Sequence, residues 1–192
     1  MNLPIILIGP MAAGKTTIAG LLAQRLGVPH YELDERRWGY YEEIGYDHDK
    51  ASQIRAAEGF LGVYRYWKPF EIHAVERVLA ECGDGVISFG AGHSVYEDDA
   101  LFERARAALA PYPNVILLLP AADPDEATAI MQGRLIAQLE EEGIEASPQM
   151  LEMVAHFTRH PSNRRLAKFV VYTAGKTPEQ TCDETLSWLR RE

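Results

Sequence analysis

Short strand-like runs alternate with amphipathic segments along most of the chain. The strand-like runs stand at residues 5–8, 30–33, 86–89, 115–119 and 169–172. Apolar residues at helical spacing predict helices at about 15–26, 50–60, 69–82, 98–109 and 123–139, another from 147 that breaks at 160–161, and a last one from 177. Strands that alternate with helices in this way predict an α/β fold, with a five-stranded parallel sheet covered by helices on both faces.

Composition and charge narrow the class of protein. The 192 residues fit one domain, 1–192, and an apolar content of 47% with 24% charged residues is ordinary for a soluble globular chain. The net charge of −9 argues against a general nucleic-acid or anionic-membrane surface. No apolar run reaches membrane-spanning length, the start lacks a basic signal-peptide region, and Cys82 and Cys182 form no C-x-x-C pair. We therefore expect a cytoplasmic protein that binds neither nucleic acid nor membrane.

A phosphate-binding loop follows the first predicted strand. The segment Gly9-Pro10-Met11-Ala12-Ala13-Gly14-Lys15-Thr16 matches the pattern G-x-x-x-x-G-K-[S/T] and leads into a predicted helix. Such a loop turns its backbone amides toward phosphate oxygens at the positive end of the helix. Lys15 is expected to reach the β- and γ-phosphates, and the Thr16 hydroxyl is expected to bind Mg²⁺. The sequence thus predicts a P-loop NTPase fold that binds ATP and Mg²⁺, with contacts from Gly9, Ala12, Ala13, Gly14, Lys15, Thr16 and Thr17.

A phosphate loop identifies the ligand but not the reaction. The N-K-x-D motif of guanine-specific GTPases is absent, and 192 residues leave little room for the extra subdomains of AAA-type ATPases. A kinase is therefore the leading hypothesis, and a non-catalytic ATP-binding switch is the competing class. A nucleic-acid 5′-kinase is disfavoured by the net charge of −9.

Polar and small residues follow two further strands. Glu32 and Asp34 stand at the end of the second predicted strand, where both carboxylates are expected to face the γ-phosphate, although a solvated acidic turn is the alternative. One carboxylate can hold Mg²⁺, and the other can accept the proton of an attacking hydroxyl. Gly90-Ala91-Gly92 follows the third strand, and small residues there let a substrate approach the backbone closely. His93 comes next, and a lone histidine is more often structural than a ligand.

Taken together, these segments resemble the shikimate kinase family of P-loop small-molecule kinases over nearly the whole chain. The phosphate loop resembles that of the family, and Glu32-Leu33-Asp34 stands where the family has Asp-x-Asp. Residues 86–92 resemble the strand that leads to its triple-glycine substrate loop. The segment from Arg159 to Ala167 is similar to its R-x-P-L-Y-x-x-x-A element.

The resemblance implies roles for individual residues. Asp34 would hold the substrate hydroxyls and act as the base, and Glu32 would lie near Mg²⁺. Arg159 would pair with a substrate carboxylate, and Arg134 would cover the nucleotide at the start of a lid. The lid is expected over residues 134–150, which lie between two helices, are acidic and contain Gly143. A substrate-binding helical subdomain is expected over residues 35–70.

The acceptor side departs from the family pattern. The triple glycine has become Gly90-Ala91-Gly92, and Leu-Tyr has become Ser162-Asn163. The Phe-Arg-x-x-Glu element of the family is not found in register, so Arg65 is our candidate for a second carboxylate-binding arginine. We also expect a carboxylate or phosphate at these arginines because their planar fork binds such groups through two hydrogen bonds.

The sequence therefore predicts an ATP-dependent kinase that phosphorylates a hydroxyl group of a small molecule. A monomer is the favoured oligomeric state. Shikimate or a related hydroxy acid is the first acceptor to test, and a different polyol, sugar acid or natural product is the alternative. The predicted catalytic residues are Lys15, Asp34 and Arg159. The predicted acceptor-binding residues are Asp34, Arg65, Gly90, Ala91, Gly92 and Arg159, and the predicted metal ligands are Thr16 and Glu32.

Overall fold

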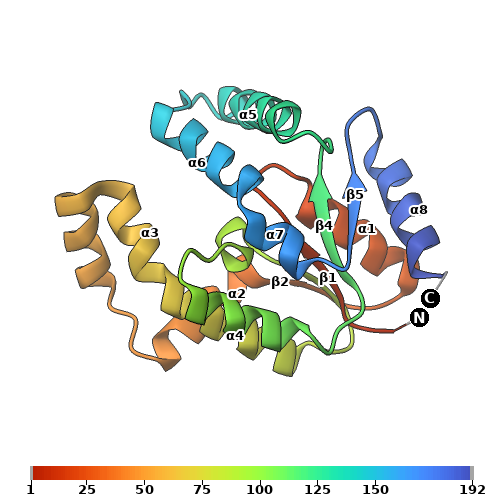
Figure 1. Ribbon diagram of the computed structural model, residues 1–192, viewed down its shortest axis with the longest axis horizontal. Coiled ribbons are helices and arrows are strands. Elements are labelled where there is room, and N and C mark those ends of the chain that lie inside the picture. The colour runs from red at the N-terminus through yellow and green to blue at the C-terminus, as the bar shows by residue number, and fades with distance from the viewer. Residues whose placement is uncertain (1, 191–192) are drawn as a thin grey trace.

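A five-stranded parallel sheet forms the centre of the molecule (Figure 1). The computed structural model describes residues 2–190. The strands are β1 (Ile5–Ile8), β2 (His30–Glu32), β3 (Val86–Ser88), β4 (Val115–Leu119) and β5 (Phe169–Tyr172). Their order in the sheet is β2-β3-β1-β4-β5, and every neighbouring pair is parallel. The predicted α/β fold with a five-stranded parallel sheet is confirmed.

Helices connect the strands and cover the sheet. They are α1 (Lys15–Leu26), α2 (Leu33–Glu43), α3 (His48–Glu81), the 3₁₀ turn η1 (Ala91–Ser94), α4 (Asp99–Leu109), α5 (Pro124–Glu141), α6 (Pro148–Arg159), α7 (Pro161–Leu166) and α8 (Pro178–Leu189). The helices α5, α6 and α8 begin with proline directly after a capping side chain, from Asp123, Ser147 and Thr177, which accepts a backbone N–H of the first turn.

The sheet separates two apolar cores. Successive strand residues point to opposite faces, so Ile6 and Ile8 belong to one core while Ile5 and Leu7 belong to the other. The first core contains side chains of α2, α3, α4 and α7, and the second contains side chains of α1, α5, α6 and α8. Figure 1 shows α1 and α8 on one side of the strands and α4 with the C-terminal part of α3 on the other. Burial on both faces explains why β1 and β4 are apolar throughout.

The helix α2 corrects the prediction for the second strand. β2 ends at Glu32, and Asp34 lies in the first turn of α2 rather than at the end of a strand. The periodicity of this segment is weak because its inward side chains are mixed with charged ones. Only Leu33, Tyr40 and Tyr41 are buried on α2.

The helix α3 consists of two helical parts, as predicted, but it corrects the predicted bounds of about 50–60 and 69–82. It runs through Pro69 to Glu81 and is interrupted at Gly59, whose φ of 68° and ψ of −160° are not helical. A proline inside a helix costs one backbone hydrogen bond, but Phe70 and Ile72 next to it are buried, so tertiary packing keeps this part helical. The part before Gly59 leaves at an angle and projects away from the sheet (Figure 1).

Candidate active site

A cavity of about 480 Å³ lies where the strands β1, β2 and β3 end. In a parallel sheet this edge is where ligands bind. The cavity is lined by the phosphate loop, by both predicted acidic residues, by the segment after β3 and by α5: Met11, Ala12, Ala13, Gly14, Lys15, Thr16, Thr17, Glu32, Asp34, Ser88, Phe89, Ala91, Leu135 and Gln138. The structure therefore brings together most of the predicted nucleotide-side residues.

The phosphate loop is held between β1 and α1 by backbone geometry that its glycines permit. Gly9 has a φ of 139°, and a Cβ atom there would lie 2.6 Å from the carbonyl oxygen of Leu118. Gly14 caps α1 with a φ of 83°. A side chain at either position would strain or displace the loop. The N-terminus of α1 is thus open toward the cavity, where its backbone amides favour an anion.

Lys15 supplies the positive charge of the loop. Its Nζ donates hydrogen bonds to the carbonyl oxygens of Gly9 (2.9 Å) and Pro10 (2.7 Å), so the side chain folds over the loop. Burial lowers the pKa of Lys15 to about 8, and the negative charge of Asp34 opposes this shift. A phosphate in the cavity would add negative charge beside the ammonium group and favour its charged form.

Thr16 and Glu32 form an oxygen pair next to Lys15. The Thr16 hydroxyl donates to Oε2 of Glu32 across 3.2 Å. Hydroxyl and carboxylate oxygens are the ligands that Mg²⁺ prefers, often together with water and substrate phosphates. This donor set fits the predicted metal site.

Asp34 is packed against the backbone of Gly90. A Cβ atom at Gly90 would collide with the Asp34 carboxylate, so only glycine lets the carboxylate lie there. Arg37, one turn later on α2, donates from an Nη atom to Oδ1 of Asp34 across 3.2 Å. Nδ1 of His93 lies 3.9 Å from the same oxygen. Sequence reasoning did not select Arg37, although its i, i+3 spacing from Asp34 on a helix would have brought the two together.

Arg134 lies at the other end of the phosphate loop. Its guanidinium donates to the Thr173 hydroxyl (3.2 and 3.3 Å), and burial lowers its pKa. A small cavity of about 150 Å³ next to the loop is lined by Arg134, Thr173, Thr17 and neighbouring residues. A cation at this position is suited to face a nucleotide that enters from the loop.

Comparison with known proteins identifies the family of the chain. The sequence model of shikimate kinase matches residues 11–190. A shikimate kinase of Saccharopolyspora erythraea is 31% identical over 180 residues, which cover 93% of this chain and 89% of that protein. The chain belongs to the shikimate kinase family. A second relative, the shikimate kinase of Streptomyces coelicolor, is 28% identical over 95% of this chain and 92% of its own length.

Membership fixes the class of reaction and agrees with the fold. A solved structure, the shikimate kinase of Acinetobacter baumannii in complex with shikimate, has a TM-score of 0.64 and 18% sequence identity, over 97% of this chain and 92% of that one. The chain is a phosphotransferase of the kind that uses an alcohol group as acceptor. Among residues 2–190, none of the helices has the length and apolar content needed to cross a membrane.

Lys68 and Glu71 carry the basic-x-x-acidic spacing that shikimate kinases show as Phe-Arg-x-x-Glu. Both side chains are buried on α3. Nζ of Lys68 donates to Oε2 of Glu71 and to the carbonyl oxygens of Gly92 (3.1 Å) and Val95 (3.0 Å). An ammonium group has three N–H bonds, and all three are used inside the protein. Sequence reasoning missed this pair because it searched for arginine, whereas the sequence has lysine after Trp67.

The two arginines predicted to bind a carboxylate lie outside the first cavity. Arg65 is exposed on α3, 4.0 Å from Glu58. Arg159, the last residue of α6, donates to Asp125 across 2.8 Å at the surface. Neither lines the cavity of the phosphate loop in the described structure. Their roles in acceptor binding stay predictions.

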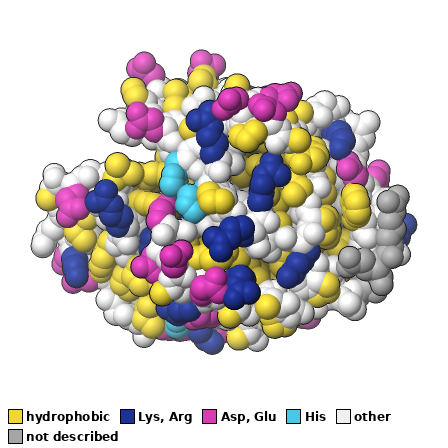
Figure 2. Space-filling view, in the orientation of Figure 1, with side chains coloured by type: hydrophobic (Ala, Val, Ile, Leu, Met, Phe, Trp, Pro, Cys, Tyr) yellow, Lys and Arg dark blue, Asp and Glu magenta, His cyan; other side chains and the backbone are white. Residues whose placement is uncertain are grey.

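A second cavity of about 600 Å³ lies between the outer part of α3 and α6. Figure 2 shows the molecule hollowed between these two parts, with histidine side chains at the inner end of the hollow. The lining residues are Glu58, Gly59, Phe60, Leu61, Tyr64, Arg65, Glu97, Gln149, Glu152, Met153 and His156. A small apolar cluster that includes Tyr64 and Met153 separates this cavity from Met11 and Ala91 of the first one. The two cavities are therefore neighbours.

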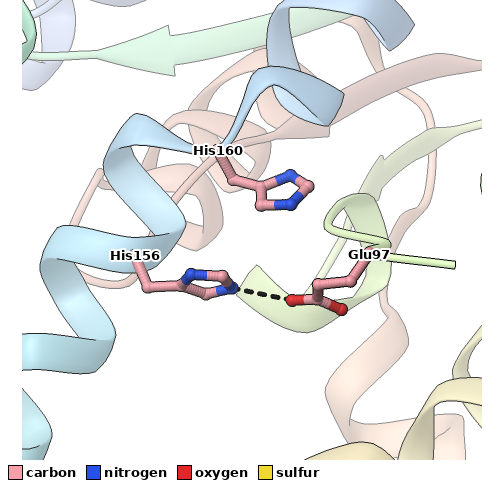
Figure 3. Close-up of side chains that lie close together, drawn as sticks. All are labelled: Glu97, His156 and His160. Atoms are coloured by element: carbon pink, nitrogen blue, oxygen red, sulfur yellow. Dashed lines mark hydrogen bonds and ion pairs between the residues drawn. The ribbon is translucent and has the colours of Figure 1, made fainter.

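Glu97 lines the second cavity, and its carboxylate points toward His156 with His160 close by (Figure 3). Oε1 of Glu97 accepts hydrogen bonds from Nε2 of His156 on α6 (2.7 Å) and from the hydroxyl of Tyr64 on α3 (2.8 Å). His160 lies close by, and its Nδ1 accepts the backbone N–H of Ser162 across 3.3 Å. A neutral His160 ring therefore carries its proton on Nε2. Nε2 is then a hydrogen-bond donor, which favours a hydrogen-bonded group over a metal site. We call Glu97 with its partners Tyr64 and His156 the Glu97 clamp.

The hydrogen bonds of the Glu97 clamp are expected to make the stability of the folded protein depend on pH. Burial alone would raise the pKa of Glu97, but the hydrogen bonds from His156 and Tyr64 outweigh it and lower the pKa to about 2. Because the folded-state pKa lies below the ordinary value of 4.5, the charged form stabilises the folded protein above about pH 4.5. This contribution is lost as the pH falls from about 4.5 to about 2.

Glu97→Gln is therefore expected to lower the melting temperature at pH 7, and its difference from wild type should shrink steadily below pH 4.5. Calorimetry from pH 7 to pH 3 measures this. Glu152→Gln, which changes an exposed carboxylate of the same cavity, should show no such convergence. Equal melting temperatures of wild type and Glu97→Gln at pH 7 would show that the clamp does not stabilise the fold.

Proposed function

We propose that the protein transfers the γ-phosphoryl group of ATP to a hydroxyl group of shikimate or a closely related hydroxy acid. The observation that carries this proposal is the shared cavity of Lys15, the Thr16–Glu32 pair and Asp34. Phosphoryl transfer requires little covalent chemistry from the protein, since it depends on positioning and on charge stabilisation. The cavity has a cation for the phosphates, oxygen ligands for a metal ion and a carboxylate for the acceptor.

Each residue has a distinct role in this mechanism. Mg²⁺, when bound, neutralises charge on the phosphate oxygens, and Thr16 and Glu32 are the residues that would hold it. Lys15 and the loop amides stabilise the negative charge on the transferred group. Asp34 accepts a hydrogen bond from the acceptor hydroxyl and takes its proton as the new O–P bond forms. Leu135 and Gln138 of α5 line the same cavity and help to exclude water.

An acid acceptor is supported by the ion pair of Arg159. Its partner Asp125 and Arg159 itself are both more than half exposed. Exposed ion pairs contribute about 0–1 kcal/mol, so Arg159 can exchange Asp125 for a substrate carboxylate at low cost. The guanidinium would then bind the carboxylate through two hydrogen bonds. The relative from Acinetobacter baumannii was solved in complex with shikimate, a hydroxylated acid of this kind.

A neutral polyol is the second candidate acceptor. It is favoured because the cations that could bind a carboxylate already have partners in this structure. Arg65 faces Glu58, Arg159 faces Asp125, and Lys68 has no unused donor. The second cavity is also lined by three carboxylates, from Glu58, Glu97 and Glu152, against one arginine. If the arginines keep these partners, the acceptor binds through its hydroxyl groups alone.

Acceptor-dependent ADP release separates the two candidates. We would supply Mg²⁺–ATP with shikimate, with shikimate methyl ester and with neutral cyclitols. The ester has the same ring hydroxyls without the negative charge, so it is a matched control. We expect turnover with shikimate and little with the ester. Turnover of the ester or of a neutral cyclitol at a higher kcat/KM would favour the polyol. No acceptor-dependent ADP with any hydroxylated compound would leave the ATP-binding switch as the better hypothesis.

Arg159→Ala is expected to weaken binding of an acid acceptor by about 2–3 kcal/mol, the scale of hydrogen bonds to a charged group. This corresponds to about 30- to 150-fold in the acceptor Kd. The Kd of ATP should hardly change. Arg159→Lys should restore binding only in part, because an ammonium group cannot make the two parallel hydrogen bonds.

The matched control for Arg159 is Arg164→Ala, which removes a neighbouring exposed arginine that donates to the carbonyl of Ala122. It should leave the acceptor Kd unchanged. If Arg159→Ala instead weakens ATP and spares the acceptor, Arg159 serves the nucleotide, and the support for an acid acceptor is lost.

We also propose that residues 134–150 act as a lid over the nucleotide. Residues 140–145 are exposed and join α5 to α6, while Leu135 and Gln138 reach the cavity of the phosphate loop. Hydrogen exchange should be fast over residues 140–147 in the free protein. ATP together with the acceptor should slow exchange across 134–150, because closure excludes water. Strong protection of 140–147 without ligand, unchanged by ligand, would argue against a lid.

We propose that residues 35–70 form the acceptor-binding subdomain. We also propose that the protein works in the cytoplasm as a monomer with a small-molecule partner. Cys82 and Cys182 are free and buried, which suits a reducing compartment. Lysine and arginine side chains are dispersed among acidic and apolar ones on the face in Figure 2, which is unlike a nucleic-acid surface. Light scattering at micromolar concentration would test the monomer.

A further inference from the structure

Two buried polar atoms lack a hydrogen-bond partner, and both flank Asp34. Among the side chains of residues 2–190, the buried nitrogen or oxygen atoms without a partner are Nε of Arg37 and Nδ1 of His93. The guanidinium of Arg37 lies 3.2 Å from Oδ1 of Asp34, and Nδ1 of His93 lies 3.9 Å from it. A buried polar atom without a partner destabilises the folded protein. Their location beside the proposed base suggests that the cost is recovered during the reaction.

The side chain of His93 is buried beside Asp34. It belongs to η1, directly after the segment that contacts Asp34, and its side chain is almost completely buried. The rings of Tyr41 and Phe89 pack against it, with centroids 6.4 and 6.5 Å away. Asp34, in contrast, has a half-exposed carboxylate at the start of α2. A closing movement between the two would therefore be made by Asp34.

The partners of His93 define which nitrogen carries the proton. Burial lowers the pKa of His93, so its ring is neutral near pH 7 and has one N–H. On one side the Asp34 carboxylate can only accept a hydrogen bond. On the other side the hydroxyl of Tyr41 lies 3.4 Å from Nε2 and can donate. The proton therefore belongs on Nδ1, which faces Asp34, and Tyr41 donates to Nε2.

We propose that His93 is a positioning residue for Asp34, whose Oδ1 it binds through Nδ1–H when nucleotide and acceptor are present. The inference rests on the proposed kinase function. The hydrogen bond needs a distance of about 3 Å, so Asp34 has to move by about 1 Å. Oδ1 is then held by Arg37 and His93 together, and Oδ2 is left to accept the proton of the acceptor hydroxyl.

Three substitutions of His93 separate positioning from packing. The side-chain nitrogen of asparagine lies close to the place of Nδ1, whereas that of glutamine lies close to the place of Nε2. His93→Leu keeps the bulk and removes both donors. We expect His93→Leu and His93→Gln to lower kcat by about 10- to 100-fold, the scale of a misplaced catalytic group. His93→Asn should keep most of kcat. The Kd of Mg²⁺–ATP and the KM of the acceptor should stay within about twofold in all three.

A double-substitution test shows whether His93 acts through Asp34. In an Asp34→Asn background, His93→Leu should cause little further loss of kcat, because the group that it positions has been removed. A full additional loss would show that His93 acts elsewhere. Equal kcat for the asparagine and glutamine variants, or a rise in acceptor KM with unchanged kcat, would also overturn the proposal.

A spectroscopic measurement tests the inference without turnover. Long-range ¹H–¹⁵N spectra identify which nitrogen of a neutral histidine carries the proton, and the His93→Gln variant assigns the signal. We expect the Nδ1–H form at pH 7 and a downfield shift of this proton when ATP analogue, Mg²⁺ and shikimate are added. The Nε2–H form would overturn the inference even if the enzyme is active. Absence of kinase activity together with the Nδ1–H form and the ligand-induced shift would reject only the proposed acceptor chemistry.

Discussion

Replacing Lys15 with alanine is expected to lower kcat/KM for phosphoryl transfer by about 10²- to 10³-fold. This is the usual loss when a donor that stabilises the charge of the transition state is removed. Nζ of Lys15 lies over the phosphate loop, bound to the carbonyl oxygens of Gly9 and Pro10. No other lysine or arginine lines the 480 Å³ cavity in the described structure. The substitution therefore removes the only side-chain cation available there to the transferred group.

The folded protein should tolerate this change. Burial already disfavours the charged ammonium, since it lowers the pKa of Lys15 to about 8. Removing the charge should thus leave the melting temperature at pH 7 unchanged or higher. Lys15→Met, which keeps the apolar stem, should be as inactive as Lys15→Ala. Lys168→Ala, an exposed lysine just before β5 and far from the cavity edge of the sheet, should behave as wild type. Transfer at a near wild-type rate by Lys15→Ala would mean that Lys15 does not serve the phosphates.

The nucleotide half of the site could be predicted from sequence because it is local. Eight consecutive residues, Gly9 to Thr16, join one strand to one helix, and their spacing alone places the amides and the lysine. The caps at Asp123, Ser147 and Thr177 are local in the same sense. Their side chains bond to backbone atoms two or three residues later, so the sequence carries the whole interaction.

The acceptor half was harder to predict because tertiary packing overrides local signals there. The two predicted helices left a gap between about 60 and 69, but the chain is helical there and the interruption of α3 lies at Gly59. Asp34 was expected at a strand end and lies on a helix instead, although it reaches the same cavity. The buried Lys68–Glu71 pair was hidden by the search for arginine. These three features depend on which side chains pack in the core. The spacing of apolar residues along the sequence does not show that.

The contacts around Asp34 and Glu97 join segments that are far apart in the sequence. His93 lies 59 positions from Asp34, and His156 lies 59 positions from Glu97. No spacing rule connects residues at such separations. From the sequence, a lone histidine such as His93 is therefore interpreted as a structural residue. Its orientation toward a carboxylate is visible only in the folded structure.

Asp34→Asn is expected to reduce kcat by about 10²-fold or more, the usual contribution of a positioned base. Asparagine has nearly the same shape, so it still fits against Gly90 and keeps an oxygen for Arg37. It cannot take the proton of the acceptor hydroxyl, so the loss should fall on kcat, while the Kd of Mg²⁺–ATP stays close to that of wild type. Rapid-quench measurement of a single turnover separates this chemical step from product release.

The control for Asp34 is Glu35→Gln, which removes the same charge from the next residue of α2. Glu35 is exposed and does not line the cavity, so this variant should keep its kcat. A loss shared by both variants would point to the overall negative charge of α2, since then neither carboxylate is special. An unchanged kcat for Asp34→Asn would move the base to Glu32, the remaining carboxylate of the cavity. If only Asp34→Asn loses turnover, proton transfer requires the carboxylate that Gly90, Arg37 and His93 surround.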